Sequence, residues 1–408
     1  RPEDRAELAR WLEVHHPRQA YDDRCFTPGG LVRHTAAPWS FDPAALANAQ
    51  ARRQPRAPAT PGVPAAPLDP EPLTDVTLDE LHRFLRHPVR AFLEQRIGVR
   101  LPVAGDAPTA TMPTGLASLH GWQVGERLLQ SLLAGHPPDD CAEAELRSGS
   151  LPPGVLGAAS LAEVIGTASQ LVAEAEARDL RRGPGAPVPV DLTLGDGTRL
   201  TGVVLDRLSP PNRGAVRIGY ARATPAHRLA TWLDLVALVA TDPETPWRSV
   251  AVHRAKNPGE VEVIALRPRG ASPDERRRLA LDALETVVEL LRLARREPIP
   301  LFPRVSHAEF SGGSSPQNWE DDLKDEATAR FYGGLSHRDL LALPAREDID
   351  PPGRGGRVQR LARHLWGAVA ASAIEDPDGA GGTGTDPASG ELPAGAPGDG
   401  PHGRERRR

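Results

Sequence analysis

Residues 188–220 have the sequence VPVDLTLGDGTRLTGVVLDRLSPPNRGAVRIGY, and we predict three β-strands in them. Apolar and polar residues alternate over 188–194 and again over 199–208, as they do in strands with one buried face. The Gly-Asp-Gly turn at 195–197 predicts that these two strands form a hairpin, because glycine adopts the backbone conformation that a tight turn needs. A third apolar stretch over 215–220 predicts the next strand.

Helical patterns surround these strands. A capping box at 77–80, Thr-Leu-Asp-Glu, begins a helix that Pro88 should split or kink and that Gly98 should end. Its inward apolar stripe consists of Leu81, Phe84, Leu85, Phe92 and Leu93. The remaining predicted elements are helices over 116–134, 161–180 and 227–240, strands over 250–254 and 261–266, and a helix begun by a capping box at 272–275. This order predicts an α+β fold in which a mixed sheet is flanked by helices.

We predict four parts along the chain. Residues 1–50 include a helix over 3–16, and residues 51–72 form a linker because they are dense in Pro, Ala and Arg. Residues 73–372 form the main folded body. Residues 373–408 are rich in Gly, Pro and Asp, so we expect a disordered tail whose basic residues 404–408 are either solvated or a DNA-binding arm.

Composition excludes several classes of protein. The net charge of -5 gives no overall basic signature for nucleic acid, so any DNA contact must be local. Cys25 and Cys141 form no CxxC pair, which indicates a reducing cytoplasm rather than a zinc site. No run of about 18 apolar residues is present, so we expect no transmembrane helix. No Gly-Lys pair exists, so we expect no P-loop for ATP, and the start at Arg1 without a signal-peptide pattern suggests a fragment of a longer chain.

Several segments resemble the C-terminal part of the RecC family. Residues 78–93, LDELHRFLRHPVRAFL, are similar to the family's signature in which a helix meets "RHP-x-R-x-F". Three further similar segments are 150–157 (SLPPGVLG), 228–235 (RLATWLDL) and 300–306 (PLFPRVS). Residues 16–22, HPRQAYD, resemble the stretch that closes the family's second helicase-like region, which would place that region's end in residues 1–50. The resemblance covers about residues 11–372.

The resemblance implies a restriction-endonuclease-like, PD-(D/E)XK fold that is catalytically degenerate. Active enzymes of this kind use two carboxylates to hold a divalent metal and a lysine beside the attacking water. The RecB-type pattern is G-x-x-D on one strand and D-Y-K on the next, whereas this chain has GVVL at 202–205 and GYA at 219–221. The metal-binding positions therefore fall on Leu205 and Gly219, and the lysine position falls on Ala221. We expect no catalytic residue and no metal ligand here.

Two residues near these positions complete the comparison. Asp206 follows Leu205, but one step along a strand turns a side chain to the opposite face. The histidine that such nucleases carry on their second helix falls near Gly125.

The lysines leave one alternative open. The chain has only Lys256 and Lys324, and Lys324 follows Asp322 with one residue between them. A migrated nuclease site would be built from Asp206, Asp322 and Lys324. However, residues 320–326 have the pattern of a charged helix, and a solvated helix face is the ordinary interpretation of such a run.

Arginines supply the candidate DNA contact. In a helix, Arg83, Arg86, His87 and Arg90 share one face opposite the apolar stripe, where they would contact phosphates without reading the base sequence. The alternative is a solvated, helix-stabilising face. A second group, made of Arg276, Arg277, Arg278, Arg292, Arg295 and Arg296, is interleaved with acids and is expected to form surface salt bridges.

The family resemblance implies a non-catalytic subunit of the RecBCD helicase–nuclease, exodeoxyribonuclease V, in double-strand break repair by homologous recombination. Such a subunit binds double-stranded DNA ends, helps to split them into single strands, and holds RecB-like and RecD-like subunits. Those partners would bind ATP and Mg²⁺, and this chain would need no cofactor. The hairpin 188–208 and the loop 310–319 are candidate wedges between the strands. A scaffold that binds only protein is the remaining alternative.

Overall fold

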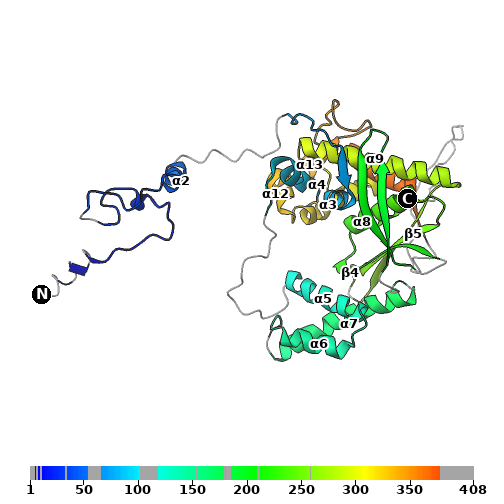
Figure 1. Ribbon diagram of the computed structural model, residues 1–408, viewed down its shortest axis with the longest axis horizontal. Helices are drawn as coiled ribbons and strands as arrows, with labels where there is room; N and C mark the ends of the chain where they lie inside the picture. The colour runs from blue at the N-terminus through cyan, green and yellow to red at the C-terminus, as the bar shows by residue number, and fades with distance from the viewer. Residues whose placement is uncertain are drawn as a thin grey trace, which may run out of the picture. The chain divides into compact units, whose positions relative to one another are not determined.

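The computed structural model describes residues 12–376 except 33–34, 54–65, 102–117, 153, 179, 181–184, 209–211 and 258, together with residues 5, 8 and 9. The chain divides into two compact units, residues 1–62 and residues 63–408 (Figure 1). Most of the helix predicted over 3–16 lies outside the described residues. The same is true of the predicted tail from residue 377 onward.

The first unit is small. It contains the 3-10 helix η1 (Asp23–Cys25) and the helix α2 (Pro43–Arg53). Arg53 at the end of α2 donates to Asp23 at 2.6 Å, and Cys25 is buried. Helix α2 continues three residues into the predicted linker, so the boundary at residue 51 was placed too early.

The second unit is a mixed α+β body with two sheets (Figure 1). The first sheet has the order β1-β3-β2 and consists of β1 (Asp75–Thr77), β3 (Arg199–Asp206) and β2 (Ala186–Thr193). The second has the order β4-β5-β6-β7 and consists of β4 (Arg213–Arg222), β5 (Trp247–Arg254), β6 (Val261–Pro268) and β7 (Ala373–Glu375). Each sheet has one parallel pair, β1 with β3 and β4 with β5. The α+β class and the β2–β3 hairpin are confirmed.

The expectation of one continuous sheet was wrong, because β3 and β4 belong to different sheets. Arg207 donates its backbone N–H to the Gly214 carbonyl at 2.8 Å, and the Asp206 carboxylate accepts from Arg213 and from the Gly214 backbone. A Cβ at Gly214 would collide with the Arg248 carbonyl oxygen of β5. The glycine therefore allows β4 to approach β5, and β4 enters the second sheet.

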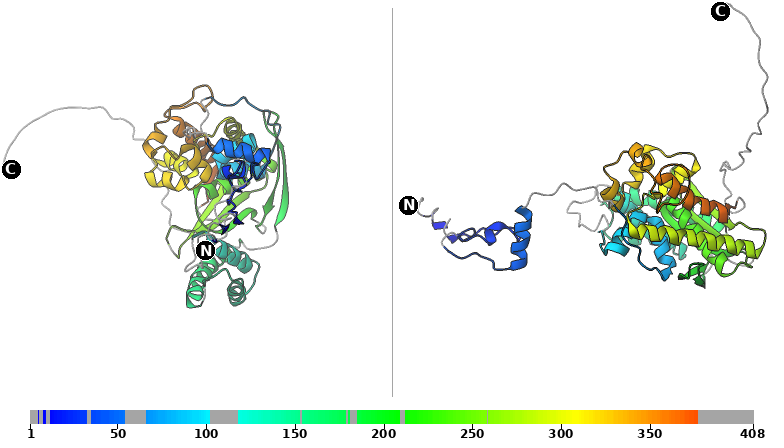
Figure 2. Two further views of the ribbon diagram at one scale, coloured as in Figure 1. Left: turned by 90° about the vertical axis from the view of Figure 1, so that its left-hand side faces the viewer. Right: turned by 90° about the horizontal axis from the view of Figure 1, so that it is seen from above.

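Helices cover both faces of the second sheet (Figures 1 and 2). On one face, α3 (Leu78–Arg86), α8 (Pro225–Thr241), α9 (Pro273–Arg296) and α14 (Arg357–Ser372) share the largest core. On the other face lie α5 (Ser118–Leu133), α6 (Pro138–Arg147) and α7 (Val155–Ala177). The predicted capping box forms at Thr77 and Glu80, where α3 begins. At the start of α9 only half of the predicted box forms: Ser272 accepts from the Glu275 backbone, while the Glu275 carboxylate accepts from Ala271.

A third cluster packs around Phe302, Trp319 and Tyr332. Its elements are α4 (Pro88–Ala91), the π-helical turn η2 (Phe92–Ile97), α10 (Pro303–Ser311), α11 (Pro316–Asp322), α12 (Glu326–Tyr332) and α13 (His337–Leu341). Pro88 separates α4 from α3, and Gly98 ends η2 with a φ of 73°, as predicted.

The folded body continues beyond the predicted boundary at residue 372. Strand β7 pairs with β6, and the Asp376 backbone N–H donates to the Ala265 carbonyl at 2.9 Å. Asp376 is buried and forms an ion pair with Arg248. The tail pattern concealed this strand because β7 is only three residues long.

One described helix, α7, is long and apolar enough to cross a membrane by length and composition, contrary to the expectation of none. Its buried residues, which include Leu161, Ala168 and Leu171, belong to the core that α7 shares with α5 and the second sheet. About a third of the most apolar stretch of α7 is buried inside the structure, at 33%.

Candidate functional site

Leu205 and Asp206 lie on opposite faces of β3, as the alternation of a strand requires. Leu205 is 36% exposed, and Asp206 is 7% exposed and faces inward. The Asp206 carboxylate is bound to Arg213 at 2.7 Å and to the Gly214 backbone at 2.8 Å. It therefore fixes the β3–β4 connection. Because β3 and β4 belong to different sheets, the described residues do not form the paired strands that the nuclease pattern implied.

Tyr220 of β4, the one residue retained from the D-Y-K pattern, packs into the helical layer. Its ring lies against Gly125 of α5, where any Cβ would collide with it. The next residue of α5, Glu126, accepts the Tyr220 backbone N–H at 2.9 Å. The predicted alignment thus places Gly125 beside β4, and the Tyr220 ring fills the space that a histidine side chain there would need.

Arg217 and Gly219 lie on the opposite face of β4, where Arg217 binds Asp234 of α8 and Gly219 lies against His253 of β5. Ala221 follows in a stretch where the pairing of β4 with β5 shifts register. A Cβ at Gly219 would lie 3.0 Å from the His253 ring of β5. His253 is 5% exposed and stacks on His227 of α8, with ring centroids 4.0 Å apart. The His253 imidazole therefore lies beside the space that the side chain of an acid at position 219 would enter.

Arg217 belongs to a network with Asp234 of α8 and His82 of α3. The Arg217 guanidinium donates to both Asp234 oxygens, at 2.6 and 3.0 Å, and His82 Nε2 lies 2.8 Å from Asp234 Oδ1. Burial raises the pKa of Asp234, but the His82 hydrogen bond and the Arg217 charge outweigh it and hold that pKa below its ordinary value. The carboxylate is thus ionised and already paired.

Two further arginines contribute to the electrostatics of His227. Arg86 at the end of α3 and Arg304 at the start of α10 act together with Arg217 on His227. Burial, followed by the charges of His253, Arg86, Arg217 and Arg304, lowers the pKa of His227 to about 3. We call Arg86, Arg217, His227 and Arg304 the basic cluster.

The structure divides the arginine stripe predicted on α3. His87 and Arg90 both contact Asp325, at 3.2 and 2.7 Å. Burial alone would raise the pKa of Asp325, but His87 and Arg90 hold it well below its usual range. Arg83 and Arg86 are exposed, and within the described part of the chain the Arg86 side chain has no hydrogen-bond or ion-pair partner. The accessible members of the stripe are therefore Arg83 and Arg86.

The alternative nuclease residues have separate local roles. Asp322 accepts from the backbone N–H groups of Val305 and Arg304, at 2.9 and 3.4 Å, and burial raises the pKa of Asp322 to about 6. Lys324 is exposed and pairs with Asp321 at 2.5 Å. Among the residues described, no group of three His, Cys, Asp or Glu side chains could hold a metal ion.

Three of the six members of the second arginine group form salt bridges, as predicted, and two others bind backbone carbonyls instead. Arg278 pairs with Asp282 and Arg295 pairs with Glu71, while Arg276 and Arg296 donate to backbone carbonyls. Arg292 pairs with Asp196 in the turn between β2 and β3.

Both candidate wedges are held by contacts within the fold. The turn of the β2–β3 hairpin is held to α9, since Gly195 donates to Glu285 at 2.7 Å. Trp319 is buried and donates its indole N–H to the Leu335 carbonyl, so it cannot insert between bases. Phe310, 41% exposed, is the accessible aromatic residue of that loop.

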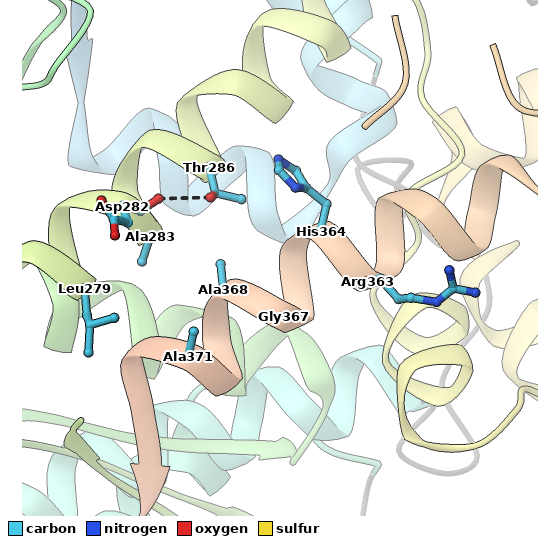
Figure 3. A pocket seen from close by; sticks show the side chains of 9 residues that line it. All are labelled: Leu279, Asp282, Ala283, Thr286, Arg363, His364, Gly367, Ala368 and Ala371. Carbon is cyan, nitrogen blue, oxygen red and sulfur yellow. Dashed lines mark hydrogen bonds between the residues drawn. The ribbon is translucent and has the colours of Figure 1, made fainter. Parts of the chain in front are cut away.

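A shallow groove of about 260 Å³ lies between α9 and α14 (Figure 3). Small residues such as Ala283, Gly367 and Ala368 line it, and Asp282, Thr286, Arg363 and His364 lie around it. Its walls are two packed helices, and it contains none of the residues of the basic cluster.

Sequence reasoning missed the network of Arg217, Asp234 and His82, although one signal was present. Asp234 is an acid within the apolar run of α8, and a charge in such a run needs a partner. The identity of that partner depends on how β4, α8 and α3 pack, which no local pattern encodes.

This chain is similar in sequence to RecC subunits. The model of the RecC C-terminal domain matches residues 73–313. The RecBCD enzyme subunit RecC of Mycobacterium tuberculosis is 34% identical over 368 residues, which are 86% of this chain and 32% of that relative. The RecBCD enzyme subunit RecC of Mycolicibacterium smegmatis is 33% identical over 299 residues, 72% of this chain and 26% of that relative. The chain spans about a third of the length of the first of these relatives. With more than half of its residues matched by the family model, the chain belongs to the RecC C-terminal domain family.

Proposed function

We propose that this chain is the non-catalytic, nuclease-like part of a RecC subunit in a cytoplasmic RecBCD complex. It would bind double-stranded DNA ends, help to separate them into single strands, and hold RecB-like and RecD-like subunits during double-strand break repair by homologous recombination. Its fold would be a degenerate PD-(D/E)XK fold. ATP and Mg²⁺ would be bound by the partner subunits. The family match and the names of the mycobacterial relatives support this role.

One observation carries the non-catalytic part of the proposal. The β4 positions that would carry an acid and a lysine are Gly219 and Ala221 instead. The buried carboxylate beside β4, Asp234, is already neutralised by Arg217 and hydrogen-bonded to His82. Magnesium requires several oxygen ligands that are not already paired with cations, so these residues do not suit it.

The DNA-binding part of the proposal assigns the contact to α3. Arg83 and Arg86 are exposed there, whereas His87 and Arg90 are bound to Asp325. Substituting Arg83 and Arg86 together with alanine should weaken binding of forked DNA and lower the slope of log affinity against log salt by about one to two, one for each lost phosphate contact. Arg90→Ala is the matched control and should leave that slope unchanged.

The experiment combines this titration with co-purification of the tagged chain and a RecB-like subunit from the same organism. We expect both binding to forked DNA and retention of the subunit. A chain that does neither would contradict the proposal.

A scaffold that binds only protein remains the second candidate, and one surface favours it. On the outer face of the β2–β3 hairpin, Pro187 pairs with Leu205 and Pro189 pairs with Val203. Val203 is 57% exposed, so this is an apolar face open to solvent. Retention of the subunit without any DNA binding would favour this candidate.

A further inference from the structure

We propose that the groove between α9 and α14 is a docking site for an amphipathic α-helix of a partner subunit. This inference rests on the partner-holding part of the proposed function and deepens it, because it names the surface and the kind of segment that the surface holds. The two helices lie side by side along the groove, with Thr286 and His364 at one end and Leu279 and Ala371 at the other (Figure 3).

The size of the groove suits the side chains of a docked segment rather than an enclosed small molecule. Its volume of about 260 Å³ is below the roughly 300–1,000 Å³ of sites that bury such ligands. From His364 to Ala371 the groove follows α14 for about 10 Å, which is about two turns of a helix. This length matches apolar residues at i, i+3 or i+4, and i+7 of one docked helix.

The floor of the groove consists of small side chains, so another helix can approach it closely. Ala283, Gly367 and Ala368 line it, and a Cβ at Gly367 would meet nothing within 4 Å. Helix axes come as near as about 8 Å when the side chains between them are small. A strand would gain less here, because the backbone groups of α9 and α14 are bonded within their own helices and offer it no hydrogen bonds.

The two edges of the groove carry opposite charges. On the α9 edge lie two exposed acids, Asp282 and Glu289. On the α14 edge lie His364 and Arg363, and Arg363 donates to a backbone carbonyl but forms no ion pair among the described residues. The pairs Asp282–Arg278 and Glu289–His364 join partly or largely exposed side chains at 3.2 Å, so exchanging them costs little. The occupant is therefore a helix with a basic edge facing α9 and an acidic edge facing α14.

Charge and shape argue against two other occupants. The acids on the α9 edge would repel the phosphates of DNA. A second copy of this chain related by a two-fold axis would bring groove against groove, which leaves both hollows unfilled. A convex, amphipathic helix from another protein fits both the shape and the charges.

The test measures binding of the full chain to purified RecB-like and RecD-like subunits of the same organism by biolayer interferometry. Gly367→Leu fills the groove and should weaken binding of one subunit by roughly tenfold or more, the loss expected when one anchor side chain is displaced. The variant should keep its fold, because a Cβ at this position meets open space and leucine favours a helix more than glycine does. Gly166→Leu on α7 is the matched control, since a Cβ there also meets nothing within 4 Å, and it should leave binding unchanged.

Two further measurements test the charged edge and the occupant. Arg363→Glu should slow association with the same subunit and weaken binding by about two- to fivefold, whereas Arg363→Lys should retain the wild-type rate. A photoreactive benzoylphenylalanine in place of Ala371 should cross-link to a segment of that subunit with apolar residues at helical spacing. A cross-link to a second copy of this chain, or equal losses of binding in Gly367→Leu and Gly166→Leu, would overturn the site.

Failure of this site and failure of the proposed function give different results. If the wild-type chain binds a subunit and Gly367→Leu binds it equally well, the groove is wrong and the partner-holding role stands. If the wild-type chain binds neither subunit, both the groove and the partner-holding role fail, and only the DNA-binding role is left. Thermal melting of each variant establishes that it is folded.

Discussion

Asp234 shows how single residues determine what this site can do. It is a buried carboxylate beside the altered β4 positions, and an unpaired carboxylate there would be a plausible metal ligand. Instead, Arg217 donates hydrogen bonds to both Asp234 oxygens, and His82 Nε2 lies within hydrogen-bond distance of one of them. Recruiting a divalent ion would require breaking a bidentate pair in a buried environment, which is strongly unfavourable.

Asp322 gives a prediction at the residue scale. Its pKa of about 6 in the folded chain is above the ordinary value of 3.8, so the folded chain binds more protons than the unfolded chain between pH 4 and 6. The free energy of unfolding should therefore fall as pH rises through that window. Asp322→Asn should remove this fall and stabilise the protein at neutral pH by up to ~3 kcal/mol.

Urea denaturation at a series of pH values measures the effect. Asp321→Asn is the control, because Asp321 is bound to Lys324 and its pKa is lowered by that hydrogen bond. The same pH dependence in Asp322→Asn and in the wild-type chain would refute the assignment.

At the scale of secondary-structure elements, the contact between α5 and β4 holds the helical layer to the second sheet. Gly125 gives the Tyr220 ring its space, and Glu126 binds the backbone of the same residue. The helix and the strand are therefore joined by one close approach and one side-chain hydrogen bond.

Gly125→Ala should destabilise the protein by about 1–3 kcal/mol, because the added methyl group collides with an aromatic ring that is itself packed. Gly166→Ala on α7 is the matched control. A Cβ there meets nothing within 4 Å, so this variant should be stabilised by roughly 0.5–1 kcal/mol through helix propensity. Equal free energies of unfolding for the two variants would show that the Tyr220 contact does not constrain α5.

Local elements of the fold could be predicted from sequence, and long-range pairings could not. The turn at Gly195–Gly197 and the caps at Thr77 and Ser272 are encoded within a few residues, and all three are present. The division into two sheets depends on the parallel pairing of β4 with β5 across α8. Strands β1 and β7 have only three residues each, too few for a periodic pattern.

For the candidate site too, motif positions could be predicted from the sequence, and long-range contacts could not. The altered positions Leu205, Gly219 and Ala221 were identified from the order of motifs. The interaction of Arg90 and His87 with Asp325 was not, because Asp325 is 235 residues from Arg90. The members of the arginine stripe that are not bound to Asp325 could be distinguished only once α12 had been placed beside α4.

For the whole molecule, the net charge of -5 gives no general attraction to nucleic acid. If this chain contacts DNA, its affinity should therefore depend on a few arginines rather than on its total charge. The chain is about a third as long as the mycobacterial RecC subunit, so its contribution would be one part of a larger DNA-handling surface.

The most direct test of the central claim is digestion of linear duplex DNA by the purified chain with Mg²⁺, followed on a gel. We predict that the DNA stays intact, because β4 carries Gly219 and Ala221 where a nuclease would carry its acid and lysine. Metal-dependent digestion that is abolished by Lys324→Ala or by Asp234→Asn would contradict this account.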